Sequence, residues 1–208
     1  MGVLGFAVVV LGAFFLGAVP FSVIVGQVFL GVDVRHYGDG NPGAANVFRA
    51  GGRLTGYLAV FLDVAKGFPF VYYAHAAFGL PVTEVVLAGL AAVLGHAFSP
   101  FLHGRGGKAI AVTFGVVLAM PDVNVAIVFA ACIIAGALLI EPDAWAISLA
   151  TAGALAYQFL NHGRSWETLL MTGILLIFLV KHAHDLRHGW PGLRGRLYRW
   201  VHGMARNT

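Results

Sequence analysis

Seven apolar segments separated by short polar loops follow one another along this chain. They lie at about 3–31, 54–79, 82–102, 109–120, 123–140, 144–161 and 166–183. A helix needs roughly 20 apolar residues to cross a hydrocarbon core of about 30 Å. The pattern therefore predicts an all-α integral membrane protein with about seven transmembrane helices joined by short loops. The fourth segment is short for a full span, so five or six spans are alternatives.

The composition supports a membrane protein and gives no sign of a separate soluble domain. Hydrophobic residues make up 59% of the 208 residues and charged residues only 11%, whereas soluble domains carry about 25% charged residues. The first apolar segment has no basic region before it, which favours a mature span over a signal peptide. We predict one polytopic membrane domain over residues 1–208.

Basic residues define a predicted orientation. They gather in loop 32–53, in loop 103–108 and in the tail 184–208, which seven spans place on one side; only Arg164 falls on the other. The positive-inside rule then predicts an outside N-terminus, a cytoplasmic C-terminus and a basic cytoplasmic tail facing anionic lipids. A basic tail also suits nucleic acid, but the apolar body favours membrane lipids, and no nucleic acid partner is expected.

The loop after the first apolar segment is rich in turn-forming residues, with the sequence GDGNPGAANVFR from Gly38 to Arg49. Its glycines allow backbone N–H groups to converge on an anion because no side chain blocks the approach. Its asparagines add neutral donors, and an arginine binds phosphate through paired hydrogen bonds. We predict a phosphate-binding loop; glycines placed only for a flexible turn and for packing are the alternative. The predicted ligands are Gly40, Asn41, Gly43, Asn46 and Arg49.

A second loop, HGRGGKA from His103 to Ala109, has the same character. Its likeness to a phosphate-binding Walker A motif is superficial, because Leu102 stands where the first glycine is required and Ala109 where a hydroxyl would bind magnesium. Glycines and two basic residues at the start of an apolar helix nevertheless favour an anion. A simple positive-inside anchor is the alternative. The predicted ligands are Arg105, Gly106, Gly107 and Lys108.

Charged and ionisable residues also occur inside apolar segments. Asp63 and Lys66 lie three residues apart on one predicted helix face, and two such charges are costly in a membrane unless paired. We predict a structural ion pair, with Lys66 also a candidate phosphate ligand. His96, in an apolar run, is expected to be a hydrogen-bonded core histidine.

The last apolar segment ends in KHAHDLRHG. His184 and His188 have the helical spacing of metal ligands, but no convincing set of further ligands accompanies them, so no metal is predicted. His182 and Asp185 are instead candidates for a catalytic base and its orienting partner.

Four blocks of this sequence resemble a known family. GxGNPGAxNVxR, DxxKG, GHxFxxFxxxxGGK and KHxxD occur in this order over roughly Gly38 to Arg187. In order and spacing they resemble the bacterial acyl-phosphate:glycerol-3-phosphate acyltransferases. The resemblance implies a multi-pass enzyme of the bacterial cytoplasmic membrane, with its active site facing the cytoplasm, that transfers a fatty acyl group from acyl phosphate to glycerol 3-phosphate and forms lysophosphatidic acid. It implies no cofactor and no metal, and we expect a monomer or a small homo-oligomer.

The resemblance assigns the two glycine loops to the substrate pocket and matches His182 to the family's C-terminal histidine. Because acyl phosphate is already activated, the protein has to align a hydroxyl with the carbonyl carbon and stabilise developing negative charge. Either His182 or an oxygen of the leaving phosphate would accept the hydroxyl proton.

Four positions depart from the family pattern. Asp39 stands where the family has serine, Ala45 where it has threonine, Ala109 where it has glycine and Asp185 where it has asparagine. A carboxylate about 4 Å from phosphate costs roughly 4 kcal/mol at an effective dielectric near 20, unless Arg35 or Arg49 neutralises it.

Asp39 is therefore a third catalytic candidate, as a carboxylate base. The alternative function is a catalytically silent homologue that binds acyl phosphate or phospholipid and regulates or scaffolds a partner. A small transporter fits less well, because the ionisable residues cluster at one face instead of following a path through the membrane.

Overall fold

The structure is a computed structural model, and it describes residues 2–193 and 195. The predicted basic tail 184–208 therefore lies largely outside the described residues. Helices account for most of the described chain, which confirms the predicted helical class. The elements are α1 (Val3–Ala18), α2 (Phe21–Val25), η1 (Gly26–Leu30), η2 (Val34–His36), α3 (Ala44–Arg49), α4 (Arg53–Ala65), α5 (Phe68–Tyr72), η3 (Tyr73–Ala77), α6 (Val82–Ala97), η4 (Pro100–Leu102), α7 (Ile110–Leu118), α8 (Val123–Leu139), β1 (Ile140–Glu141), α9 (Asp143–His162), α10 (Trp166–Lys181), α11 (Ala183–His188) and β2 (Gly192–Leu193).

Three helical stretches in the described chain are apolar and long enough to cross a membrane. They run over Val3–Leu30, Arg53–Ala77 and Val82–Leu102. The first is interrupted where α1 ends and Pro20 precedes α2, because proline has no N–H to continue the helical hydrogen bonds. Helix α8 is also apolar but shorter.

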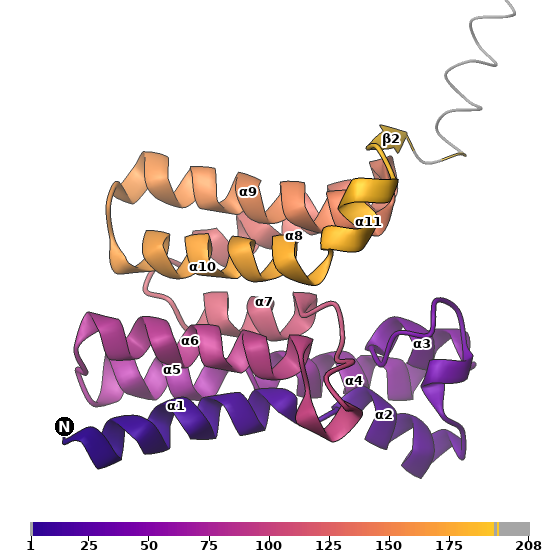
Figure 1. Cartoon of the computed structure of the whole chain (residues 1–208), viewed down its shortest axis with the longest axis horizontal. Coiled ribbons are helices and arrows are strands. Elements are labelled where there is room, and N and C mark those ends of the chain that lie inside the picture. The colour runs from indigo at the N-terminus through magenta and orange to yellow at the C-terminus, as the bar shows by residue number, and fades with distance from the viewer. Residues whose placement is uncertain (1, 194, 196–208) are drawn as a thin grey trace, which may run out of the picture.

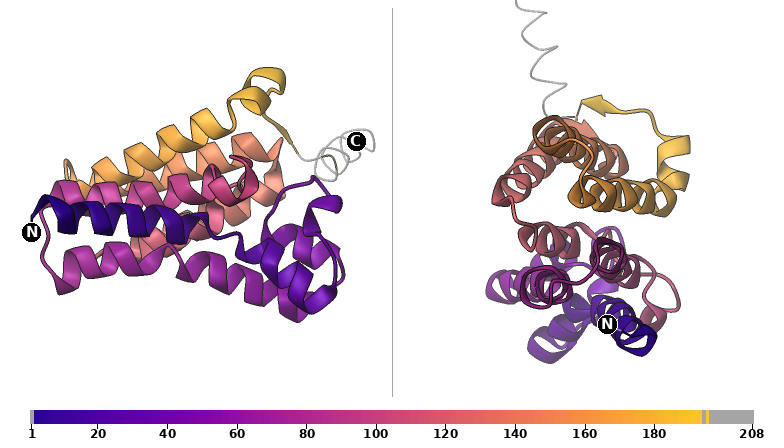
Figure 2. Two further views of the ribbon diagram at one scale, coloured as in Figure 1. Left: turned by 60° about the horizontal axis from the view of Figure 1, so that its bottom comes forward. Right: turned by 90° about the vertical axis from the view of Figure 1, so that its left-hand side faces the viewer.

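The helices form two layers that share a common direction. In Figure 1, α8, α9 and α10 lie above α7, and α1, α4, α5 and α6 lie below it. The end-on view in Figure 2 shows most of these helices nearly parallel. Helix α1 packs on α6, α8 on α9, and α4 on α7, while α10 bridges α9 and α6.

Small residues allow the closest helix crossings. A Cβ atom on Gly17 of α1 would overlap the carbonyl oxygen of Ala92 in α6, and one on Gly95 of α6 would overlap that of Phe14. Gly115 of α7 meets the carbonyl oxygen of Val64 in the same way. Close approach of helix backbones through glycine is typical of membrane helices, which gain van der Waals contact from it.

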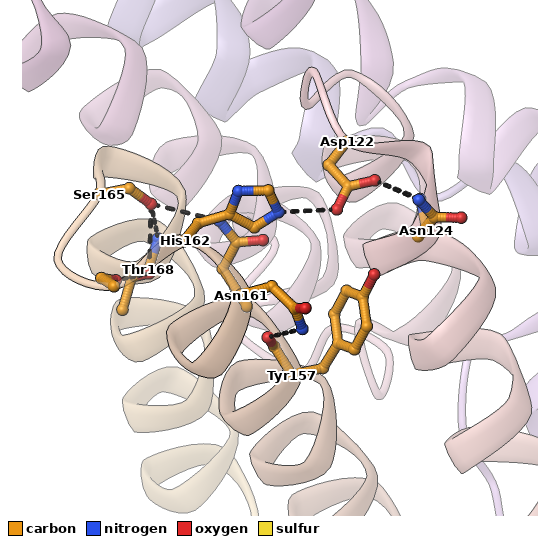
Figure 3. A network of polar contacts seen from close by, with 9 residues as sticks. Asp122, Asn124, Tyr157, Asn161, His162, Ser165 and Thr168 are labelled. Atoms are coloured by element: carbon orange, nitrogen blue, oxygen red, sulfur yellow. Dashed lines mark hydrogen bonds and ion pairs between the residues drawn. The ribbon is translucent and has the colours of Figure 1, made fainter.

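The two ends of the bundle differ. At the far end, the Asp122 carboxylate contacts His162 Nε2 at 2.9 Å, which joins the α7–α8 turn to the end of α9 (Figure 3). Asp122 also accepts a hydrogen bond from the backbone N–H of Asn124 at 2.9 Å and so caps α8. Ser165 caps α10 in the same way. The glycine loops lie at the opposite end, near α3 and α11, which we call the polar end.

Candidate active site

Four segments distant in the sequence meet at the polar end. They are the loop 37–43, the loop 103–109, the start of α9 and the chain from the end of α10 to β2. Together they line an open polar groove. The pairing of β1 with β2 joins Ile140 to Leu193 and holds the last described segment against the start of α9. The two glycine loops predicted to act together are therefore neighbours in space.

Lys108 is the centre of this arrangement. Its Nζ lies 2.7 Å from Asp39 Oδ2 and 2.9 Å from Asp143 Oδ2. The Lys108 side chain is 28% exposed, so the ammonium remains reachable from the groove. The two contacts join three segments: the first glycine loop, the second glycine loop and the N-terminus of α9.

These ion pairs change the titration of both loop residues. Burial by itself raises the pKa of the Asp39 carboxyl, but the hydrogen bond and the charge of Lys108 outweigh it, and the pKa lies below its ordinary value of 3.8. Burial by itself lowers the pKa of Lys108, but hydrogen bonds to Asp39 and Asp143 outweigh it, and the pKa lies above 10.5. Both groups are therefore charged at neutral pH, and a lowered pKa makes Asp39 a weaker base than a free carboxylate.

Of the two arginines predicted to neutralise Asp39, only Arg49 contacts it, and Lys108 makes the shorter contact. Arg35 is bound to Asp33, with Nη2 to Oδ2 at 2.6 Å. Arg49 Nη1 lies 3.5 Å from Asp39 Oδ1, a looser contact than that of Lys108. Arg35 is diverted because Asp33, two residues before it, accepts both its backbone N–H and its guanidinium. Lys108 is thus the main countercharge, with Arg49 second.

Asn46 organises the first loop. Its amide nitrogen donates to Asp39 Oδ1 at 3.1 Å and to the Asn41 carbonyl oxygen at 2.9 Å, and its amide oxygen accepts from Arg49 Nη1 at 2.7 Å. The residue is buried. The backbone N–H groups of Gly40 and Gly43 are likewise bonded to carbonyl oxygens within the loop. In this conformation several of the predicted neutral donors hold the loop itself.

The second loop rests on the end of α6. The backbone N–H of Gly107 donates to the His96 carbonyl oxygen at 3.1 Å. A Cβ on Gly106 would overlap that same oxygen, and one on Gly107 would overlap the His96 ring. Gly106 and Gly107 therefore allow close packing against His96. In the sequence analysis, packing was considered as a role for the glycines of the first loop only. Arg105, beside them, is exposed.

Lys181, at the end of α10, fastens the same loop. Its Nζ donates to the carbonyl oxygens of Ala97 at 2.6 Å and Gly106 at 3.2 Å, and lies 5.1 Å from the centre of the Phe98 ring. It thereby ties α10 to α6 and to the second loop. The next residue along the chain is His182.

His182 is present in the groove but does not pair with Asp185. The ring is buried, and its Nε2 has no hydrogen-bond partner among the described residues. The Asp185 carboxylate instead contacts His184 Nδ1 at 3.4 Å, and both of those side chains are exposed. The expected orienting contact is absent because α10 ends at Lys181, just before His182, and α11 then carries Asp185 with its side chain exposed.

Asp63 and Lys66 form the predicted internal ion pair. Lys66 Nζ lies 2.7 Å from Asp63 Oδ1 and donates to the Val19 carbonyl oxygen at 2.8 Å. Ser22 donates to Asp63 Oδ2 at 2.6 Å. Both charged side chains are at most 3% exposed. Lys66 is thus bound to Asp63 and to Val19, between α1 and α2. It does not line the groove beside Lys108.

A narrow cavity of about 380 Å³ leads from Lys108 into the bundle. Its polar lining includes Asp39, Asn46, Asp63 and His96 besides Lys108. Its other walls are apolar and come from α4, α7 and α8: Val60, Val64, Ile110, Phe114, Phe129, Ile133 and Ile134. A cavity with one charged end and a long apolar wall suits an amphiphile with an anionic head.

The sequence analysis had assigned no role to three components of this site. Asp143 has the position of an ordinary first-turn acid of a helix, and nothing local connects it to Lys108. Lys181 begins the KHxxD block, but by itself it resembles an interfacial lysine at the end of a span. Phe129 is one apolar residue among many. Within the described chain, no group of three or more His, Cys, Asp or Glu side chains has metal-ligand geometry.

The fold and the site define a helical membrane protein with a cation-centred pocket that opens into an apolar cavity. The family model described as glycerol-3-phosphate acyltransferase matches residues 7–191. Proteins of that name from Laribacter hongkongensis and Wolbachia pipientis wMel are similar to this chain. The first is 39% identical over 189 residues, covering 89% of this chain and 92% of its own length. The second is 34% identical over 192 residues, covering 92% and 98%.

The fold resembles that of a crystallised protein as well. PlsY (YgiH), described as an integral membrane glycerol 3-phosphate acyltransferase and crystallised in its glycerol 3-phosphate form, aligns with a TM-score of 0.77 at 29% identity, covering 96% of this chain and 93% of that one. Its lysophosphatidic acid form aligns with a TM-score of 0.76. This chain belongs to the glycerol-3-phosphate acyltransferase family.

Proposed function

We propose that this protein transfers a fatty acyl group from acyl phosphate to glycerol 3-phosphate and releases lysophosphatidic acid and inorganic phosphate. The observation that carries the proposal is the cavity that joins Lys108 to the apolar walls of α4, α7 and α8. An acyl phosphate would place its phosphate at the ammonium and its chain along those walls. Family membership supports the same substrate class.

Three cationic side chains are the proposed phosphate ligands. Lys108 and Arg49 both approach Asp39 at the cavity mouth, and Arg105 lines the adjoining groove. The acceptor has its own phosphate, so the site has to accommodate two anions close together. Cations facing an open groove meet that need, because charge-assisted hydrogen bonds to phosphate oxygens are strong and directional.

The chemical step is an attack of the acceptor hydroxyl oxygen on the acyl carbonyl carbon. The bond between that carbon and the phosphate oxygen breaks, and inorganic phosphate leaves with the bonding electrons. Lys108 would stabilise negative charge on the leaving phosphate. The hydroxyl proton has two candidate acceptors, an oxygen of the leaving phosphate and His182 Nε2, which is buried and has no hydrogen-bond partner among the described residues.

The membrane arrangement is part of the proposal. Seven spans would place the N-terminus outside and the polar end in the cytoplasm of a bacterial cell, where glycerol 3-phosphate is soluble. The distribution of basic residues supports this orientation, because Arg49, Arg105 and Lys108 lie at the polar end. Against these three, Arg164 follows α9 at the other end.

The test is acyl transfer by the purified protein in nanodiscs, given palmitoyl phosphate and radiolabelled glycerol 3-phosphate. Labelled lysophosphatidic acid from the wild type, lost in Lys108→Ala, would support the proposal. Product from Asp39→Ser alone would mean that Asp39 has disabled an intact scaffold. No product from either protein would overturn the proposal and favour the silent, lipid-binding alternative. His182→Ala separates the two proton acceptors, since a nearly unchanged kcat would exclude the histidine.

A further inference from the structure

The peptide group between Gly106 and Gly107 is held at both of its polar atoms. Its N–H, which belongs to Gly107, donates to the His96 carbonyl oxygen at 3.1 Å. Its carbonyl oxygen, which belongs to Gly106, accepts a hydrogen bond from Lys181 Nζ at 3.2 Å. One bond comes from α6 and the other from the end of α10, so two helices together fix the orientation of a single planar peptide group in the second loop.

This peptide group would be free to turn without those bonds. Glycine stands on both sides of it, and glycine populates more backbone conformations than any other residue. Neither position admits a side chain in this fold, because a Cβ at Gly106 would overlap the His96 carbonyl oxygen and a Cβ at Gly107 would overlap the His96 ring. Packing against α6 therefore requires a flexible backbone here, and hydrogen bonds have to restrain it.

Lys108 follows directly after this peptide group. A rotation of the peptide plane moves the Cα of Lys108, and with it the ammonium that the proposed mechanism directs at the donor phosphate. A displacement of about 1 Å in the position of a reacting group costs up to roughly a hundredfold in rate. The orientation of the peptide between Gly106 and Gly107 therefore bears directly on the reaction.

The contacts of Lys181 are those of a residue that anchors the backbone. Its Nζ also donates to the Ala97 carbonyl oxygen at 2.6 Å, and Ala97 is the last residue of α6. The last carbonyl groups of a helix have no partner within it and form the negative end of its dipole, which a cation stabilises. The Phe98 ring completes the surroundings, with its centre 5.1 Å from Nζ. These partners are uncharged, whereas Lys66 and Lys108 contact carboxylates.

We propose that Lys181 is a positioning residue for acyl transfer: it fixes the peptide between Gly106 and Gly107 and thereby directs Lys108 toward the phosphate of the acyl donor. This inference deepens the proposed function and rests on it for its kinetic form. The restraint on the loop is a property of the fold, and it can be measured without any substrate.

The kinetic test compares the wild type with Lys181→Met, which removes the ammonium and keeps a side chain of similar length. At saturating glycerol 3-phosphate, we expect kcat/KM for palmitoyl phosphate to fall about a hundredfold. Lys181→Arg keeps the charge and the donors and should recover most of that loss. Lys181→Gln, with a shorter neutral side chain, replaces the methionine variant if that variant does not fold.

Trp145→Phe is the matched control. It removes another hydrogen bond from a side chain to a backbone carbonyl, the one from Trp145 Nε1 to Gly189, and leaves both bonds of the peptide between Gly106 and Gly107 in place. We expect this variant to keep the wild-type kcat/KM.

Hydrogen–deuterium exchange shows whether the loop itself has been released. In Lys181→Met the segment 103–109 should exchange about tenfold faster than in the wild type, the effect of losing one hydrogen bond to a charged group. In Lys181→Arg and Trp145→Phe the same segment should exchange at the wild-type rate.

Three results would overturn the proposal. Lost activity with unchanged exchange in segment 103–109 would mean that Lys181 contacts the substrate itself. Faster exchange with unchanged kcat/KM would mean that the orientation of this peptide does not matter for catalysis. An equal loss of activity in Lys181→Met and Trp145→Phe would mean a general effect of weakened packing at the polar end.

Binding of inorganic phosphate separates this inference from the proposed function. Phosphate is titrated into the wild type, Lys181→Met and Trp145→Phe, and the shift in melting temperature gives each Kd. If the wild type shows no acyl transfer but Lys181→Met binds phosphate about tenfold more weakly than Trp145→Phe, the proposed function fails and the positioning role stands. Equal or tighter binding by Lys181→Met, or no binding by the wild type, overturns the positioning role whatever the activity.

Discussion

His96 lies directly against Gly107. Its carbonyl oxygen accepts the Gly107 N–H at 3.1 Å, and its ring occupies the space that a Gly107 side chain would need. The loop that carries Lys108 is therefore positioned by α6, at a place where a glycine is required for packing.

The first prediction concerns Gly107→Ala. The added methyl overlaps the His96 ring, so the loop has to shift, and we expect a loss of about 1–3 kcal/mol in stability together with a large fall in kcat/KM. Melting temperature in detergent and acyl transfer measure the two effects. His96→Ala provides the matched test: in the double variant the alanine at 107 should cost much less than in the wild-type background. A cost that is independent of residue 96 would contradict this packing role.

A second prediction follows from the buried pair of Asp63 and Lys66. Asp63→Ala leaves the Lys66 ammonium charged and buried without its partner, and such a loss costs about 3–5 kcal/mol. Asp63→Leu combined with Lys66→Met removes both charges at similar volume and should recover most of the stability. Thermal unfolding in detergent compares the three proteins.

The double variant also tests whether Lys66 binds phosphate. If it folds and keeps the wild-type KM for glycerol 3-phosphate, Lys66 is structural. A KM raised tenfold or more, on the order of 1.4 kcal/mol of binding free energy, would mean that Lys66 contributes to phosphate binding.

The third prediction concerns Ala109, whose φ of 62° lies in the left-handed region. Alanine in this conformation costs roughly 1–2 kcal/mol, and glycine would adopt it without that cost. Ala109→Gly removes the strain but also a buried methyl, worth about 0.8 kcal/mol, so we expect nearly unchanged stability. Ala109→Val should lose more than about 2 kcal/mol, because a β-branched residue is an outlier at positive φ. Equal melting temperatures for the glycine and valine variants would contradict the argument.

The fourth prediction is a pH dependence at the far end (Figure 3). The hydrogen bond to His162 lowers the pKa of Asp122 below its ordinary value of 3.8. A carboxyl with a depressed folded-state pKa contributes stability above the unfolded pKa and loses it as the pH falls through the folded one. Asp122→Ser keeps a side chain able to cap α8 but removes the carboxylate.

The difference in melting temperature between wild type and Asp122→Ser should therefore be constant just above pH 4 and shrink below it. Acyl transfer at neutral pH should be the same in both, because Asp122 lies at the end opposite Lys108. A difference that persists unchanged to pH 2 would show that the carboxylate contributes nothing through its charge.

Local patterns in the chain were enough to predict a large part of this protein. The helical segments follow from the lengths of the apolar runs, and the ion pair of Asp63 and Lys66 follows from its spacing of three residues on one helix. The break before Pro20 is also local in origin, although the sequence interpretation treated 3–31 as one segment. Both loops that meet at Lys108 were recognised by their glycines and basic residues.

Only the tertiary structure decided how those residues are used. Lys108 binds Asp143, 35 positions away, and Lys181 donates to the carbonyl oxygen of Gly106. A side chain at position 107 is excluded by the ring of His96. Local patterns report what each residue tolerates in its own helix or loop, since backbone geometry and transfer from water act on neighbours in the chain. Which cation meets which carboxylate depends on helices packed together from distant segments, and that packing is a property of the whole fold.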